Sequence, residues 1–199
     1  PGNYVRPVGE DVVAGDMIIP AWHRLAPPDL GAVLAGGKQE IEVLKKIKVA
    51  VLPTGDEIVA PGQSLVRGNI IEFNGTVISN YIKSWGGEPI LYPITKDIKA
   101  DLRKTVQKAV DTADVVIINA GSSAGRDDYT SSIIAELGEV LVHGVSTKPG
   151  KPTILGMIQG KPVLGIPGYP VSAYLALDWF CKPLLYHMHH QGPPLRPHL

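Results

Sequence analysis

The sequence has little cysteine, no surplus of charge of either sign and no long apolar run. Its 199 residues include one cysteine, Cys181, which excludes an internal disulfide and a zinc site built from several cysteines. A reducing, cytoplasmic setting is therefore the default expectation. The 19 lysines and arginines balance 19 aspartates and glutamates, so no basic surplus indicates a nucleic-acid partner. Because no apolar run reaches the roughly 18 residues of a bilayer span, no membrane partner is expected either.

The residues that are present predict a folded chain with many turns. Hydrophobic residues make up 44% and charged residues 19%, which is enough for a core and too mixed for a disordered chain. Glycine and proline number 22 and 18, well above average usage. In residues 1–45 short apolar stretches alternate with turns. We expect a small β-rich piece there, with strands at 16–20 and 40–44 and a loop or short helix at 28–34.

From residue 46 onward, strand-like and helix-like segments alternate. Short apolar runs predict strands at 47–52, 89–93, 115–119, 140–142, 153–155 and 163–166. Apolar residues at helical spacing predict helices around 77–85, 102–113, 128–137 and 171–187. This alternation is typical of an α/β domain, here a three-layer sandwich with a mainly parallel sheet over residues 46–187. Residues 188–199 are rich in proline and indicate a linker or tail.

Polar residues and glycines follow the first three predicted strands of this domain. In chain order they are Thr54, Gly55, Asp56, Glu57, Thr95, Asp97, Gly121, Ser122, Ser123, Gly125 and Asp128. Open α/β sheets bind ligands beyond the carboxyl ends of their strands, so we expect these residues to gather at one site.

Three of the carboxylates, Glu57, Asp97 and Asp128, are candidates for holding a hard cation. Magnesium prefers oxygen ligands and usually touches one or two carboxylates while keeping waters and substrate phosphates. Asp97 and Asp128 have an alternative role as helix caps, for which aspartate is well suited. The two roles do not exclude one another.

Three turns could bind an anion. The glycine and serine loop at 121–125 leads toward a helix start, where free backbone N–H groups suit a phosphate, although such loops also close many strand–helix turns. Lys148 and Lys151 lie on a proline and glycine turn and could neutralise a phosphate or an oxyanion, or simply face solvent. The turn at 167–172 must bend sharply into the last helix, and its amides could face a ligand.

Taken together, five segments resemble the molybdopterin molybdenumtransferase family, the MoeA and gephyrin E-domain proteins. They match in order and spacing from about Tyr4 to Tyr186. The segments are VRPVGED at 5–11, VAVLPTGDE at 49–57, the loop at 119–125 with Asp128 and Tyr129 after it, KPGKP at 148–152 and PGYPVS at 167–172. The family's counterparts are an RxxGED segment, TGDE, a Ser/Thr-Gly-Gly-x-Ser-x-Gly loop, KPGKP and PGNPVS.

The resemblance implies a MogA-like molybdopterin-binding fold and a homodimer that inserts molybdate or tungstate into adenylylated molybdopterin. That reaction releases AMP and needs Mg²⁺. Glu57 and Asp128 would hold the metal, Asp97 would help to orient the attack, and Lys148 would lie near the oxyanion. Arg6 and Asp11 would complete the catalytic site. The implied substrate-binding residues are Thr54, Gly55, Asp56, Gly121, Ser122, Ser123, Gly125, Lys151, Pro167, Gly168, Pro170 and Ser172.

The chain departs from this family at three positions and in its extent. Ala120 stands for the first glycine of the loop, Tyr169 for the usual asparagine and Gly144 for a frequent lysine or arginine. Residues 1–45 resemble only a remnant of the family's first domain, so we expect a partial chain that is inactive alone. Two other functions stay open. One is a MogA-like adenylyltransferase, which loads AMP onto molybdopterin, and the other is a scaffold module that binds molybdopterin without turnover.

Overall fold

The chain forms two compact units in the computed structural model, which describes residues 2, 4–120 and 129–192. One unit consists of residues 1–45 together with His189–Gln191, and the other contains Lys46–Met188. Most of the expected proline-rich tail, residues 193–199, lies outside the described residues.

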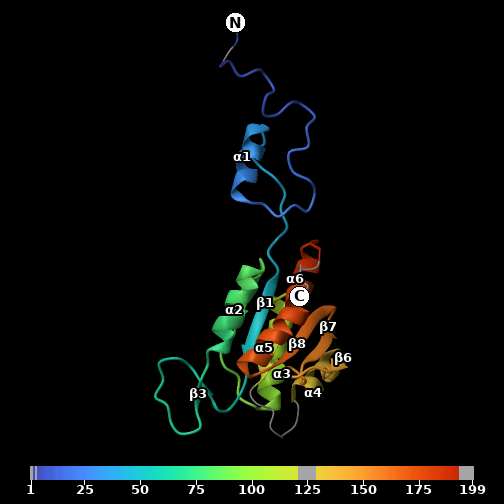
Figure 1. The fold of residues 1–199 in the computed structure, drawn as a ribbon. Coiled ribbons are helices and arrows are strands. Elements are labelled where there is room, and N and C mark those ends of the chain that lie inside the picture. The colour runs from blue at the N-terminus through green and yellow to red at the C-terminus, as the bar shows by residue number, and fades with distance from the viewer. Residues whose placement is uncertain (1, 3, 121–128, 193–199) are drawn as a thin grey trace. The chain divides into compact units, whose positions relative to one another are not determined.

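The second unit is built on a six-stranded sheet (Figure 1). The strand order across the sheet is β4 (Glu88–Leu91), β1 (Lys48–Pro53), β5 (Val115–Ala120), β8 (Lys161–Pro167), β7 (Ile154–Ile158) and β6 (Glu139–His143). The first four run parallel, and β7 and β6 are antiparallel to their neighbours. The expected mainly parallel sheet is therefore confirmed, with an antiparallel edge.

Two helical layers cover the faces of this sheet (Figure 1). Successive side chains of a strand point to opposite faces, so Val49 and Val51 pack on one side and Ala50 and Leu52 on the other. The first side packs against α2 (Asn74–Ser84), α5 (Pro170–Ala176) and α6 (Lys182–Met188). The second packs against α3 (Lys99–Thr112) and α4 (Tyr129–Leu137). This arrangement confirms the α/β three-layer sandwich.

The last helix differs from the continuous helix expected over 171–187. A wider π-helical turn, η1 (Leu177–Cys181), separates α5 from α6. Leu177, Cys181 and Leu185 still reach the core, and burial raises the pKa of the Cys181 thiol to about 12. Within the described parts of the chain, no helix combines the length and the apolar character needed to span a membrane.

A small strand pair follows the first strand of the sheet and was not expected. β2 (Ile58–Val59) and β3 (Ile70–Ile71) are parallel and hold the two ends of the intervening loop together. The backbone N–H of Ile70 donates to the carbonyl of Glu57 at 2.9 Å, and that of Glu72 donates to Val59 at 2.8 Å. Figure 1 shows this segment extending beyond the edge of the six-stranded sheet.

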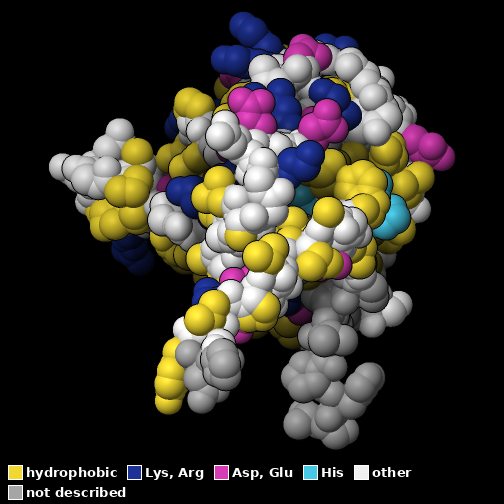
Figure 2. Space-filling model, turned by 90° about the horizontal axis from the view of Figure 1, so that it is seen from above, with side chains coloured by type: hydrophobic (Ala, Val, Ile, Leu, Met, Phe, Trp, Pro, Cys, Tyr) yellow, Lys and Arg dark blue, Asp and Glu magenta, His cyan; other side chains and the backbone are white. Residues whose placement is uncertain are grey.

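The first unit is less structured than the sequence suggested. Its described residues form one helix, α1 (Pro27–Ala35), and the strands expected at 16–20 and 40–44 are wrong. A strand needs a neighbour to take up its backbone hydrogen bonds, and neither stretch pairs with another in the described part of this unit. None of its described residues is buried, so α1 leaves Leu30 and Leu34 exposed. Figure 2 shows hydrophobic side chains at several places on this face of the molecule.

Candidate functional site

The carboxyl ends of β1 and β4 bring three carboxylates together, as the sequence predicted for Glu57 and Asp97. The chain after β4 returns to β1 through a bridge between Thr54 and Thr95. Gly55 N–H donates to the Thr95 carbonyl at 3.1 Å. This bridge allows the Asp97 N–H to donate to Asp56 Oδ1 at 3.2 Å.

Electrostatics within this group suit a cation. Partial burial raises the pKa of Asp97 above its ordinary value, and the neighbouring carboxylates of Asp56 and Glu57 raise it further. No three Asp, Glu, His or Cys residues in the described ranges are arranged as a metal site on their own. Magnesium needs only one or two protein carboxylates when phosphates and waters supply the rest, so this donor set fits Mg²⁺. Asp128, the other predicted ligand, lies outside the described residues.

Asn119, near the carboxyl end of β5, connects the ends of three strands through hydrogen bonds. Its side-chain Nδ2 donates to the Pro167 carbonyl of β8 at 2.9 Å. Its own carbonyl accepts the N–H of Thr54 at 3.0 Å, and the Thr54 hydroxyl donates to the same oxygen at 3.4 Å. Both residues are buried, so the floor of the site is held by bonds that water does not replace.

A cavity of about 220 Å³ opens beside this floor. Its polar lining includes Glu57, one of the three clustered carboxylates. It also includes Glu72, which is buried and accepts a hydrogen bond from the Gly75 N–H at 2.6 Å. Apolar and aromatic side chains form most of the remaining wall. The described lining residues are Pro53, Thr54, Glu57, Ile58, Ile70, Ile71, Glu72, Phe73, Asn74, Asn119, Gly168, Tyr169 and Pro170.

The structure brings part of the last predicted turn to this cavity. Gly168 and Pro170 line it, and Pro167 takes part through its carbonyl, which Asn119 binds. Ser172 is buried inside α5 and does not line the cavity. The predicted loop residues Gly121, Ser122, Ser123 and Gly125 lie outside the described residues.

Lys148 and Lys151 line a second, open cavity of about 450 Å³, and none of its described lining residues lines the first cavity. Hydroxyl groups of Ser146 and Thr147 lie in the same lining. The turn is held by the N–H of Val145, which donates to the Lys151 carbonyl at 2.8 Å. Two lysines and the Ser146 hydroxyl make a lining that suits an oxyanion, whereas the Thr147 hydroxyl donates to the Pro149 carbonyl at 3.3 Å.

The departure at Gly144 follows from the backbone of this second cavity. Gly144 has a φ of +84°, a conformation that residues with a Cβ rarely adopt. A Cβ at this position would also lie 3.3 Å from the Lys151 carbonyl oxygen. Glycine here therefore preserves the turn, even though it supplies no cation.

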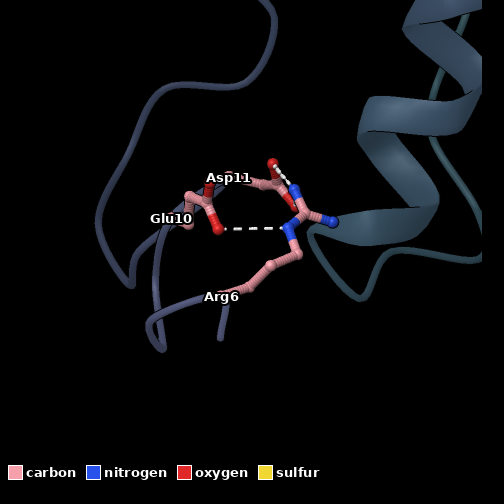
Figure 3. Close-up of polar contacts among 3 residues, drawn as sticks. All are labelled: Arg6, Glu10 and Asp11. Atoms are coloured by element: carbon pink, nitrogen blue, oxygen red, sulfur yellow. Dashed lines mark hydrogen bonds and ion pairs between the residues drawn. The ribbon is translucent and has the colours of Figure 1, made fainter. Parts of the chain in front are cut away.

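Arg6 and Asp11 belong to the first unit and are not part of the strand-end group. Their side chains form a two-pronged ion pair, with Arg6 Nη2 at 2.6 and 2.8 Å from the two Asp11 oxygens (Figure 3). Arg6 Nε also donates to Glu10 at 3.1 Å. Both Arg6 and Asp11 are about 70% exposed, so the pair is available to a ligand or a partner.

Sequence reasoning missed Glu72, Phe73 and Asn74, which form one side of the first cavity. They precede α2 directly, and Asn74 Nδ2 donates to the Gly168 carbonyl at 2.7 Å. A signal was present, because a large aromatic residue at a helix start is unusual. Asn119 was noticed only as the first residue of the resembling loop.

Comparison with protein families identifies most of the second unit. Residues 50–187 match a family model described as "Probable molybdopterin binding domain". The match spans β1 to α6 and includes both cavities.

Curated relatives and solved structures agree with this match. The chain is 33% identical over 189 residues to a molybdopterin molybdenumtransferase of Nostoc sp., covering 93% of this chain and 43% of that protein. The corresponding protein of Haemophilus influenzae is 32% identical over 185 residues, covering 93% and 46%. A crystal structure of the molybdopterin biosynthesis MoeA protein from Pyrococcus horikosii aligns with a TM-score of 0.84 and 40% identity, covering 92% of this chain and 46% of that one. The chain thus spans a little under half the length of these relatives.

A smaller protein shares the fold alone. The tungsten cofactor synthesizing protein MoaB from Pyrococcus furiosus aligns with a TM-score of 0.56 at 20% identity, covering 74% of this chain and 98% of that one. The core of the second unit therefore has the same architecture as a protein that consists almost entirely of this fold.

Proposed function

Because the chain belongs to the molybdopterin-binding domain family, we propose that it acts in molybdenum cofactor biosynthesis by inserting molybdate or tungstate into adenylylated molybdopterin. In the same reaction water would hydrolyse the phosphoanhydride bond, so that AMP is released and the other phosphate stays on molybdopterin. The observation that carries the proposal is the gathering of Asp56, Glu57 and Asp97 at one end of the sheet. It is supported by the relatives named molybdopterin molybdenumtransferase.

The carboxylates would act on the phosphate end of the substrate. Glu57, with Asp128 from outside the described residues, would hold Mg²⁺, and Asp97 beside them would orient the attacking group. When bound, Mg²⁺ supplies positive charge that neutralises the phosphate oxygens. Thr54 and Asn119 fix the strand ends, so Glu57 is held in place before the substrate arrives.

The second cavity, which Lys148 and Lys151 line, would bind the oxyanion that is to be inserted. Lys148 and Lys151 line one cavity with Ser146 and Thr147, so two positive charges and the Ser146 hydroxyl could bind a tetrahedral dianion, while the Thr147 hydroxyl already donates to the Pro149 carbonyl at 3.3 Å. Molybdate, tungstate and sulfate share this shape and charge. We therefore expect competition among them for the same cavity.

A homodimer would explain the exposed apolar residues of the first unit. With no buried residue among its described positions, this unit gains little stability from packing within itself. A second copy could cover its exposed apolar residues, and the Arg6–Asp11 pair could then contribute to a neighbour's site. Since the chain spans less than half of its relatives' length, we propose that it binds substrate alone but turns over only in the full-length context.

The deciding experiment measures Mg²⁺-dependent AMP release from adenylylated molybdopterin with the chain in its full-length context. Glu57→Gln and Asp97→Asn should each lower kcat at least tenfold while leaving the far-UV spectrum unchanged. Glu88→Gln is the matched control, because Glu88 is an exposed carboxylate at the start of β4, the opposite end of the sheet. Wild-type turnover by both site variants would refute the assigned roles.

This assay and a second one, with ATP and molybdopterin as substrates, distinguish the alternatives. Binding of molybdopterin with no AMP release in the full-length context would indicate a scaffold module. Transfer of AMP from ATP onto molybdopterin would indicate an adenylyltransferase.

A further inference from the structure

Two exposed aromatic residues stand at helix starts beside the first cavity. Phe73 is the N-cap residue of α2 and Tyr169 that of α5, and neither side chain makes a capping hydrogen bond. Serine, threonine, aspartate and asparagine are the residues that stabilise this position. Phe73 is 45% and Tyr169 is 68% exposed, so neither contributes a full side chain to the core. Helix capping and core packing therefore leave both aromatic side chains unexplained.

A hydrogen bond holds the two aromatic positions close to each other. Asn74, the residue after Phe73, donates through Nδ2 to the carbonyl of Gly168, the residue before Tyr169, at 2.7 Å. Both aromatic side chains line the cavity of about 220 Å³, together with Ile58, Ile70 and Ile71 from the small strand pair. The site thus has aromatic and branched apolar walls that remain in contact with water.

We propose that Phe73 and Tyr169 bind a planar nitrogen heterocycle by stacking in this cavity. The inference rests on the proposed function, because adenylylated molybdopterin carries two such rings, the pterin and the adenine. Stacking on aromatic faces is tolerant of ring type, so either ring could be the occupant. The position of Tyr169, where the resembling family usually has asparagine, makes this subsite a property of the present chain.

The size of the cavity favours one ring system. Pockets that enclose a drug-sized ligand measure roughly 300–1,000 Å³, so about 220 Å³ is too small for the whole substrate. Pterin and adenine both present N–H donors on their edges. Glu72 lines the cavity with a buried carboxylate, and a carboxylate can accept more bonds than the one that it makes to the Gly75 N–H.

The lining also separates this subsite from the charged parts of the site. Lys148 and Lys151 belong to the other cavity, and the lining of the ring subsite includes no lysine or arginine among the described residues. Glu57 lines the first cavity and also belongs to the cluster of Asp56, Glu57 and Asp97. A substrate with its ring against Phe73 and Tyr169 would therefore direct its phosphates toward Glu57.

The test measures binding of two separate probes, free pterin and AMP, to the chain by calorimetry. Phe73→Leu and Tyr169→Asn remove the aromatic faces and should weaken the bound ring about tenfold or more, whereas Tyr169→Phe keeps the face and should bind as wild type. Tyr174→Leu is the matched control, because Tyr174 is a 40% exposed aromatic of α5 outside the cavity lining. The probe that loses affinity identifies the ring.

Equal affinity of wild type, Phe73→Leu and Tyr169→Asn for both probes would overturn the inference, provided that circular dichroism shows both variants folded. Wild-type chain that binds neither probe would overturn it as well. In either case AMP release in the full-length context would still decide the proposed function by itself. If a variant loses AMP release but binds the ring as wild type does, the loss would be due to the clustered carboxylates of Asp56, Glu57 and Asp97 and not to aromatic stacking.

Discussion

Replacing Asn119 with alanine tests whether the floor of the site depends on one side-chain bond. The change removes the Nδ2 donor from the buried Pro167 carbonyl, which it binds at 2.9 Å. It leaves the backbone bond from the Thr54 N–H to the residue 119 carbonyl in place. The perturbation therefore acts on the link between β5 and β8 and spares the link between β5 and β1.

The expected loss follows from the burial of this bond. Asn119 is 5% exposed, so water cannot readily take the place of the lost donor. A buried acceptor that loses its partner destabilises a protein by about 1–3 kcal/mol. For a unit of this size about 1 kcal/mol lowers the midpoint of thermal unfolding by roughly 2–4 °C, so we expect a decrease of about 2–12 °C. Asn119→Asp should be worse, because it directs a carboxylate at a carbonyl oxygen.

The assay is thermal and urea unfolding of the chain, followed by circular dichroism. Asn80→Ala is the matched control, since Asn80 makes the same kind of bond at the surface, from Nδ2 to the Thr76 carbonyl at 2.8 Å. An exposed substitution of this kind changes stability by less than about 0.5 kcal/mol. If the two alanine variants unfold at the same midpoint, the reasoning from burial is wrong.

Two further predictions concern the core and the first unit. The Cys181 thiol, with its pKa raised by burial to about 12, is about one part in 10⁴ thiolate at pH 8, so iodoacetamide should leave it unmodified in the native chain and alkylate it after unfolding. Mass spectrometry checks this, and rapid native alkylation would contradict it. Leu30→Lys with Leu34→Lys should shift the mass measured by light scattering from dimer to monomer, because both leucines are exposed on α1. Leu65→Lys, an exposed apolar change in the other unit, is the control, and a monomeric wild type would refute the dimer.

The sheet and its helices could be predicted because their burial leaves a plain pattern. A strand that is covered on both faces is almost entirely apolar, as in Val115–Ala120, where the first five residues are buried and Asn119 is the one polar residue. Helices covered on one face show apolar residues three and four positions apart, as Leu102, Val106 and Val110 do in α3. These patterns come from local spacing, so sequence alone identifies them.

The errors arose where structure depends on partners. The stretches at 16–20 and 40–44 are as apolar as short strands, but a strand exists only beside another strand, and propensity does not supply one. The pair β2 and β3 was missed for the opposite reason. Each has two residues, and its pairing is set by the folding back of a loop. The π-helical turn at Leu177–Cys181 leaves the apolar spacing almost unchanged and so gives no local signal.

The site was predictable where its residues follow strands directly. Glu57 and Asp97 are brought near each other because β1 and β4 are parallel neighbours, which the rule for strand ends anticipates. Phe73 and Tyr169 were not anticipated, since they start two helices whose approach depends on the bond from Asn74 to Gly168. Residues that line a cavity through such tertiary contacts have no spacing in the sequence that unites them.

The loop between β7 and β8 affects the register of β8, the strand that leads into the turn at 167–172. Ile158 pairs with Lys161 across a two-residue loop, in which Gln159 and Gly160 both have positive φ, at +52° and +73°. Loops of this kind match the twist of the strands and specify how they align. By contrast, β8 meets β5 through residues far apart in the chain, such as Val163 and Val116. An insertion of one residue into the loop would exchange the two faces of β8, so that Leu164 and Ile166 would point to the helical layer on the other side of the sheet. The alignment of the strand that leads into the turn at 167–172 thus depends on two residues at its opposite end.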